Sequence, residues 1–347
     1  MQEAGAQPKR RRRRLAGMSR RAVLKALLAL PVLAACEKPM LGQQRPEIRP
    51  KILQKRIEAI ADRAAPAELG VAVEDLSTRQ LWAFNGDRPF PLGGAARVPI
   101  LAAAMAETAA GRLPLDEALV VRDVDLSPPP STVAEAWPRR RTWSLAELEA
   151  LARGGDTTAL DLVTRRIGGP GAVDGWLNVE RLEGVTVDRY RRQIATDARG
   201  LASFRADWKS PVAWRAAIDA VPARERARAA RRRRADPRDT ATPVGMLRLL
   251  EAFLNRELIP TPDLGRLLGR DRGYLEAALP EGARLLQAAG AAPPDLGVFP
   301  TSHAVAVIEL KDGRRIGFVI FLAASTADEA ARQALIADVG RAVLREF

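Results

Sequence analysis

Apolar and polar positions along this chain follow two different periods, and the two-residue period is concentrated near the ends. Residues 69–76 and 80–84 are two strand-like runs separated by a short polar turn, which predicts a hairpin. Residues 304–310 and 315–323 flank Lys311-Asp312-Gly313, a strong turn signal, and predict a second hairpin. We therefore expect antiparallel strands from both ends of the chain to share one sheet.

The helical period marks residues 51–64 before the first hairpin and residues 327–345 after the second. Between the hairpins the pattern is mostly helical, with predicted helices at 98–107, 145–153, 158–167, 172–177 and 243–254. The simplest arrangement is an α/β (α+β) lobe built from residues 51–90 and 280–347, with an all-α lobe, 91–279, inserted between its halves. A cleft is expected between the two lobes.

Charge and rare residues exclude several classes of protein. The net charge is +13, but residues 1–35 hold nine Lys or Arg and one Glu, so the rest of the chain carries only +5. That distribution argues against nucleic acid as a partner. With one cysteine, Cys36, and one histidine, His303, neither an internal disulfide nor a zinc site of the several-histidine kind is possible. We expect no metal and no cofactor, and a monomer.

The first 35 residues have the features of an export signal. Ser19-Arg20-Arg21-Ala22-Val23-Leu24-Lys25 precedes a short apolar stretch, as in twin-arginine signals, and Leu33-Ala34-Ala35-Cys36 is similar to a lipobox. The sequence thus predicts a lipidated Cys36, a tether over residues 36–50, and a membrane-anchored lipoprotein facing the periplasm or the cell exterior. The alternative is an ordinary signal peptide with an incidental cysteine. Met18 as the true start would explain the basic run at residues 9–14.

A series of short segments points to one family. In chain order they are Phe90 to Val98, Leu113 to Leu119 with Thr142 to Leu148, Asp156-Thr157-Thr158-Ala159, Val185 to Tyr190, Arg238-Asp239-Thr240-Ala241-Thr242-Pro243, and Leu279 to Gly282. In these segments and in their order the chain resembles the class A β-lactamases. The resemblance implies the two-lobed fold of serine β-lactamases and penicillin-binding proteins, with an antiparallel sheet, flanking helices and an inserted all-α lobe.

The resemblance also implies catalytic positions, and here they hold other residues. The family attacks an acyl carbonyl with a serine activated by a lysine or, through water, by a glutamate. The degenerate positions are Gly94 and Arg97 for Ser-x-x-Lys, Gly155-Asp156-Thr157 for Ser-Asp-Asn, Arg191 and Ala195 for the omega-loop Glu and Asn, and Ala288-Ala289-Gly290 for Lys-Thr/Ser-Gly. No serine in the chain is followed by lysine three residues later. The sequence therefore predicts a pseudoenzyme, with Asp156 retaining a structural role.

Gly94, Gly155, Ala288 and Ala289 are all smaller than the residues they replace, which predicts a wider cleft. Arg97 and Arg191 replace the lysine and the glutamate, which predicts a more basic cleft that binds an anion, such as a carboxylate of a cell-wall stem peptide. Alternatively, Arg97 pairs with Asp156 or Glu147 and only holds the lobes together. Trp137 and Trp143 are expected at the cleft rim or in the core. Ser302 and His303 together form a weaker candidate for a hydrolase, since neighbouring strand residues point to opposite faces.

Residues 191–237 form a basic insert, for which the pattern favours a solvated helix followed by a loop; contact with anionic lipid or wall polymer is the alternative. Three functions stay open. The first is an inactive binding or scaffold protein of the envelope, with a wall fragment or an envelope protein as partner. The second is a serine hydrolase acting on β-lactam or peptidoglycan-type amides through non-standard residues. The third is an interaction protein that uses the basic insert.

Overall fold

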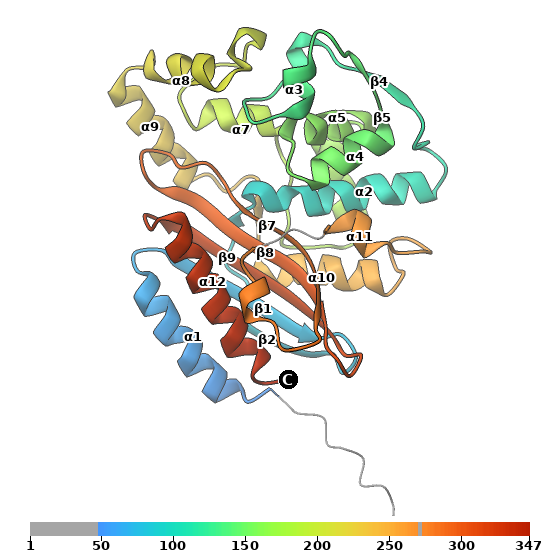
Figure 1. Cartoon of the computed structure of the whole chain (residues 1–347), viewed down its shortest axis with the longest axis vertical. Coiled ribbons are helices and arrows are strands. Elements are labelled where there is room, and N and C mark those ends of the chain that lie inside the picture. The colour runs from blue at the N-terminus through green and yellow to red at the C-terminus, as the bar shows by residue number, and fades with distance from the viewer. Residues whose placement is uncertain (1–47, 270–272) are drawn as a thin grey trace, which may run out of the picture. The chain divides into compact units, whose positions relative to one another are not determined.

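The computed structural model describes residues 48–269 and 273–347 (Figure 1). The predicted signal peptide, Cys36 and most of the predicted tether lie outside the described residues. The strands are β1 (Glu68–Asp75), β2 (Gln80–Phe84), β3 (Phe90–Pro91), β4 (Ala118–Val120), β5 (Thr142–Ser144), β6 (Thr240–Ala241), β7 (Arg284–Ala291), β8 (Phe299–Glu309) and β9 (Arg315–Ser325).

The α-helices are α1 (Pro50–Ala64), α2 (Arg97–Ala109), α3 (Thr132–Ala136), α4 (Leu145–Arg153), α5 (Thr157–Ile167), α6 (Pro170–Val179), α7 (Arg191–Asp197), α8 (Pro211–Asp219), α9 (Ala223–Arg234), α10 (Pro243–Leu254), α11 (Leu264–Leu267) and α12 (Glu329–Leu344). A 3₁₀ turn, η1 (Gly93–Ala96), leads directly into α2. Among the described residues no helix is both long enough and apolar enough to cross a membrane.

The main sheet is antiparallel, with the order β2-β1-β9-β8-β7. Both predicted hairpins are confirmed: Asp75 pairs with Gln80 in the first, and Glu309 pairs with Arg315 in the second. The central pairing of β1 with β9 joins the two ends of the chain. The sequence pattern did not identify β7 as a strand, because its small residues carry little of the two-residue alternation.

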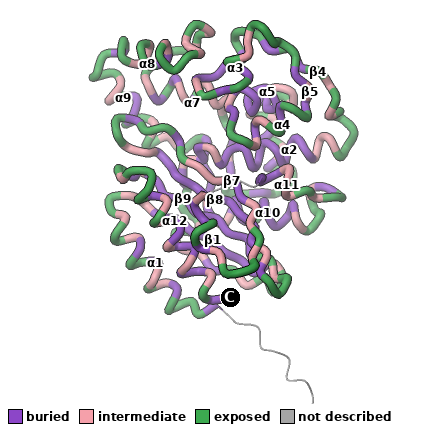
Figure 2. Tube along the Cα trace, viewed as in Figure 1, coloured by how far each residue is buried: buried purple, intermediate pink, exposed green. Residues whose placement is uncertain are grey.

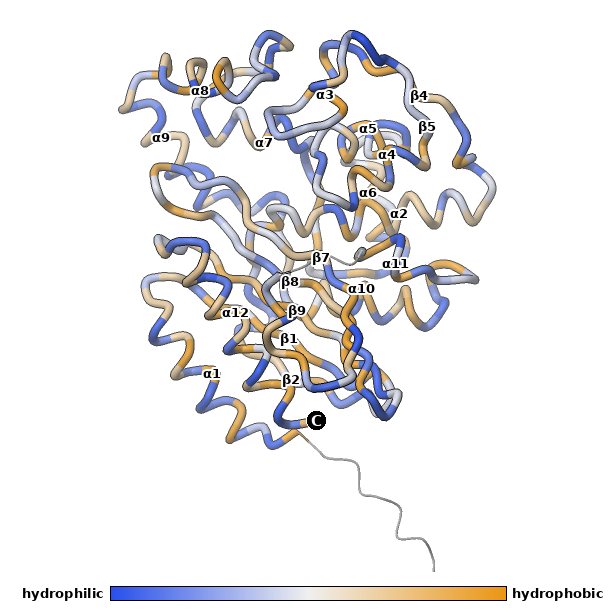
Figure 3. The backbone as a smooth tube through the Cα atoms, viewed as in Figure 1, coloured by the Kyte–Doolittle hydropathy of each residue, from blue (hydrophilic) through white to orange (hydrophobic). Residues whose placement is uncertain are grey.

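The two faces of the sheet bury different side chains, as the alternation along a strand requires. Val71 and Val73 pack with Phe318 and Ile320 beneath α1 and α12, which lie side by side on one face (Figures 1 and 3). Ala72, Val319 and Phe321 face the other way, into a second core shared with the helices of the insert. Both faces of the sheet are therefore covered (Figure 2).

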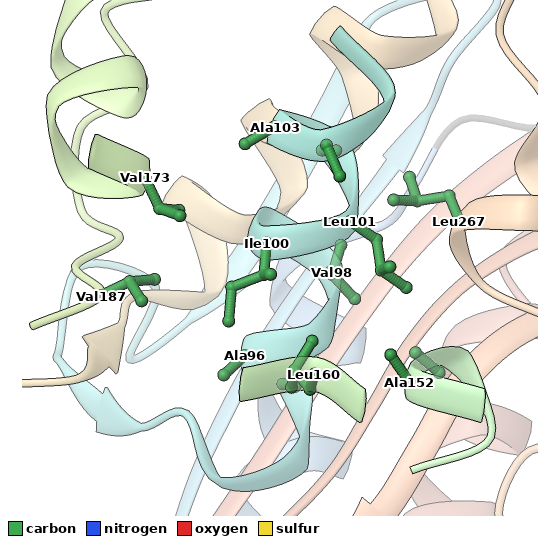
Figure 4. Close-up of a cluster of buried hydrophobic side chains, with 14 of the residues drawn as sticks. Ala96, Val98, Ile100, Leu101, Ala103, Ala152, Leu160, Val173, Val187 and Leu267 are labelled. Carbon is green, nitrogen blue, oxygen red and sulfur yellow. The ribbon is translucent and has the colours of Figure 1, made fainter. Parts of the chain in front are cut away.

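The centre of the second core is α2, whose residues 97–105 are all buried. Figure 4 shows its apolar side chains among those of several other helices, with Ala152, Leu160, Val173 and Leu267 around it. A helix buried on all sides is a fixed support, and its first turn points toward β7 and β8, since η1 contacts both strands. One boundary differs from the expected lobes: α10, assigned to the inserted lobe, packs on β1 and β9.

Candidate functional site

A cavity of about 910 Å³ lies where η1, α5 and β7 meet the helices of the basic insert. Its walls come from parts of the chain that are far apart in sequence, including the 128–130 segment, the start of α5, α7 to α9, the 289–296 segment and β8. This is the size range of small-molecule binding sites. The cavity therefore occupies the place where the sequence predicted a cleft.

Most of the degenerate family positions line this cavity. They are Gly94, Arg97, Gly155, Thr157, Arg191, Ala195, Ala289 and Gly290. Two of the predicted residues do not line it. Ala288 is fully buried in the core behind the wall. Asp156 caps α5 by accepting from the Ala159 amide at 2.9 Å, and it also accepts from the Ser131 hydroxyl, so its role is structural.

Gly94 faces the imidazole of His303 across the start of α2. A Cβ atom on Gly94 would lie 2.9 Å from Cε1 of His303, closer than real Cβ contacts allow. His303 is fully buried, and neither of its ring nitrogens hydrogen-bonds to a described residue. Burial, with Arg97 and Arg191 nearby, lowers the pKa of His303 well below its usual range. A neutral imidazole therefore stands behind the position of the family's nucleophile.

Arg97 is buried and donates from Nη2 to the carbonyl oxygen of Ala289 at 3.1 Å, which joins α2 to β7. The two carboxylates proposed as its alternative partners are bound by other groups. Asp156 caps α5, and Glu147 pairs with Arg140, which lowers the pKa of Glu147 to about 2. Arg97 therefore remains at the cavity wall, where the sequence placed it.

Arg191 begins α7, and its position is set by Asp161 on α5. The amides of Arg191 and Arg192 donate to the two carboxylate oxygens of Asp161 at 2.6 and 3.0 Å, and the Ser127 hydroxyl donates to the same carboxylate. Burial lowers the pKa of Arg191, and its guanidinium forms no ion pair with any residue that the structure describes. The charges of Asp239 and Asp161 oppose this effect of burial without forming an ion pair with the guanidinium.

The basic insert differs from the predicted solvated helix and loop. It folds into three α-helices, and each has one face toward the cavity. The lining positions are Arg191, Ile194, Ala195, Ala198 and Arg199 on and just after α7; Pro211, Trp214, Arg215, Ile218 and Asp219 on α8; and Arg226, Ala230 and Arg233 on α9. These spacings of three, four and seven residues are those of one helix face. Sequence reasoning missed this signal, although the printed sequence contains it.

Trp214 is the aromatic residue of the described cavity wall. It is 8% exposed and is held edge-on by Phe204 at 5.6 Å between ring centroids. Neither Trp137 nor Trp143 lines the cavity; Trp143 is buried, with the Arg140 guanidinium 3.5 Å from its ring centroid. Of the two places expected for these tryptophans, the structure therefore favours the core, where Trp143 is buried and Trp137 packs against it.

The Ser302 and His303 pair is not a catalytic pair. Ser302 points away from the cavity and accepts a hydrogen bond from Nε of Arg332 on α12 at 3.0 Å, whereas His303 lines the cavity. Within the described wall there is no serine, lysine, cysteine or glutamate, and Thr157 supplies the hydroxyl. No cluster of three metal-ligating side chains occurs in the described parts of the chain.

A five-stranded antiparallel sheet with terminal helices on one face, and a buried helix starting at a cleft on the other, is the architecture of the solved class A β-lactamases. The chain belongs to the Beta-lactamase enzyme family, whose model matches residues 51–347. The class A fold predicted from the sequence is confirmed by its relatives among solved structures.

An ancestral class A β-lactamase (GNCA) is 26% identical, covers 85% of this chain and 100% of its own, and has a TM-score of 0.66. A β-lactamase from Chitinophaga pinensis, 19% identical over 84% of this chain and 97% of its own, shares the fold with a TM-score of 0.67. Among curated proteins, β-lactamase VEB-1 from Pseudomonas aeruginosa is 20% identical over 80% of this chain and 85% of its own length.

Proposed function

We propose that this domain is a catalytically inactive member of the β-lactamase family that binds an anionic ligand in the cavity. We further propose that it is exported and held at the membrane through lipidated Cys36, as a binding or scaffold protein of the cell envelope. The relatives share the fold and carry β-lactamase names, but the chemistry depends on the side chains in this chain's own cavity.

The observation that carries the proposal is the pair of Gly94 and His303. A serine at position 94 could not be accommodated without moving His303, because its Cβ would meet the imidazole. The neighbouring base position holds Arg97, and arginine stays protonated in proteins, so it cannot accept the nucleophile's proton. With attacking group and base both replaced, no acyl-enzyme route is left.

Binding is supported by the charge of the cavity wall. Six arginines line it (Arg97, Arg191, Arg199, Arg215, Arg226 and Arg233), whereas the described carboxylates there are Asp219 and Asp295. Guanidinium groups in a partly buried wall recognise carboxylates and phosphates through paired N–H donors. The carboxylate of a wall stem peptide fits this chemistry, and so does any other compact oxyanion.

Incubation of the purified domain with a fluorescent penicillin and with a chromogenic cephalosporin tests the lack of catalysis. We expect no covalent mass increase and no turnover above the buffer rate, while an active class A β-lactamase at the same concentration turns over the cephalosporin and a penicillin-binding protein, which keeps its acyl group, gains the mass of the penicillin. A hydrolase using Thr157 or another residue of the wall would give an acyl adduct that maps to one peptide, and that result would reject the proposal.

A further inference from the structure

The cavity contains a second group of arginines, away from Arg97 and Gly94, that the family motifs do not include. Arg199, Arg226 and Arg233 all line the wall formed by the basic insert. Their side chains are largely enclosed, with 13%, 28% and 15% of the surface exposed. Arg215 of α8 adds a further, exposed cation at the same wall.

Only long ion pairs join these arginines to the carboxylates of the described wall. Asp295 lies 3.8 Å from Arg199 and 3.5 Å from Arg233, and the structure records a hydrogen bond to it from neither guanidinium. Arg226 reaches only Asp219 on α8, at 3.4 Å, and its Nε is buried without a described partner. Arg199 donates from Nη1 to the carbonyl oxygen of Ala195 at 3.0 Å. Each guanidinium has five N–H donors, so most of this donor capacity is still unused by the described residues.

Burial in this wall also lowers the pKa of both Arg199 and Arg233, with Asp295 opposing the effect and, for Arg233, Asp239 and Asp236 as well. Enclosed cations to which no nearby carboxylate is hydrogen-bonded are costly unless another anion joins them. An oxyanion bound between Arg199 and Arg233 would accept paired charge-assisted hydrogen bonds and remove that cost.

The two groups of arginines lie on different parts of the same cavity wall. Arg191 begins α7 and Arg199 lies two residues beyond its end, so their Cα atoms are eight residues apart, which corresponds to about 12 Å along a helix. Between them the wall is apolar, formed by Ile194, Ala198 and Trp214. A ligand that contacts Arg191 as well as Arg199 would therefore pass along this apolar wall.

We propose that the ligand of this cavity is an elongated dianion, with one oxyanion group at Arg191 and a second between Arg199 and Arg233. Its middle is apolar and packs on Ile194 and Trp214. This inference rests on the proposed anion-binding function and adds to it the number and spacing of the anionic groups. The His303 imidazole, buried beside Gly94 without a described hydrogen-bond partner, is a further polar contact at the inner end.

The test compares α,ω-dicarboxylates, from succinate to sebacate, with monocarboxylates of the same chain length by isothermal titration at fixed ionic strength. We expect one range of lengths at which the dicarboxylate binds about tenfold or more tighter, since the second group adds charge-assisted hydrogen bonds. R233Q and R191Q each remove one end, so each abolishes the advantage of the dicarboxylate while retaining weak binding of the monocarboxylates.

R232Q is the matched control, because Arg232 is the exposed neighbour on α9 and its substitution changes the net charge equally. It should leave the preference for the dicarboxylate within twofold. If monocarboxylates bind but no dicarboxylate gains, or if R232Q acts like R233Q, the second subsite is rejected and the anion-binding function stands. If neither kind of carboxylate binds, the proposed function itself fails.

Discussion

At the scale of residues, the nucleophile position lacks a side chain, and a neighbouring side chain occupies the space beside it. Gly94 leaves the nucleophile position without a side chain, and the imidazole of His303 fills the space that a Cβ there would need. The sequence motifs identify the missing side chain at position 94. They do not identify the contact with His303, because the folded sheet brings β8 and β7 next to η1 and no local pattern encodes that contact.

A double-mutant cycle measures this steric coupling. G94A should lower the free energy of unfolding by about 1–3 kcal/mol through overpacking against His303. In the H303A background the same change should cost close to nothing. G175A is the control, because Gly175 is an exposed position of α6 with open space around it, and alanine there should stabilise the helix by about 1 kcal/mol. Urea denaturation supplies the values; equal costs of G94A in both backgrounds would contradict the packing argument.

His303 also predicts a dependence of stability on pH. Burial keeps its folded-state pKa well below the ordinary 6.5, so the unfolded chain binds a proton that the folded chain does not. As the pH falls below 6.5, the free energy of unfolding should drop by up to about 1.4 kcal/mol per pH unit because of this residue. It is the chain's one histidine, so H303N should remove this slope between pH 6.5 and 5.5. An unchanged slope would show that the imidazole is protonated in the folded protein.

At the scale of elements, the composition of the basic insert does not predict which of its arginines line the cavity. Its run of arginines is typical of a solvated helix, and five of the arginines of α9 are exposed to solvent. The other two, Arg226 and Arg233, share a face with Ala230, and this small alanine lets the helix approach the cavity. Periodicity applied to charged residues, as it is to apolar ones, would have predicted this face.

An ion-pair cluster closes the insert where its two ends meet. Nε of Arg189 lies 2.7 Å from a carboxylate oxygen of Asp239, and that buried carboxylate also accepts from the amides of Asp188 and Arg189. R189A should lower the free energy of unfolding by about 3 kcal/mol, because it leaves Asp239 buried and unpaired. It should also increase hydrogen exchange across residues 188–239 and weaken anion binding at α7 and α9.

R238A is the comparison for that variant. Arg238 directly precedes Asp239 in the chain, and it pairs with Asp236 while about half exposed, so its removal should cost less than about 1 kcal/mol. Similar losses for R189A and R238A would mean that the cluster acts through general surface charge and does not hold the insert closed.

At the scale of the whole molecule, the architecture was predictable because strong local signals agreed with one another. Two hairpins with clear turns and two terminal helices define the sheet and one of its covers. Less predictable were β7, whose alanines and glycine carry no pattern, and α10, which packs on the sheet although it follows the inserted helices in sequence. The cavity needed the tertiary structure, because its walls come from segments separated by up to two hundred residues.

From residue 37 onward the chain contains no cysteine, so the fold of the domain depends on no internal disulfide. If Cys36 is the lipid-modified N-terminus, wild-type protein should sediment with membranes and incorporate a fatty-acid label. C36S should be exported but remain soluble and unlabelled, since the acyl chains supply most of the membrane affinity.

R20K/R21K should instead hold the protein in the cytoplasm, which separates the export signal from the anchor. A C36S protein that still sediments in low salt and is released at high salt would point to the exposed arginines of α9 as the membrane contact. That outcome would remove the lipid anchor from the proposal and leave the anion-binding cavity unaffected, because the exposed and the cavity-facing arginines lie on different faces of the same helix.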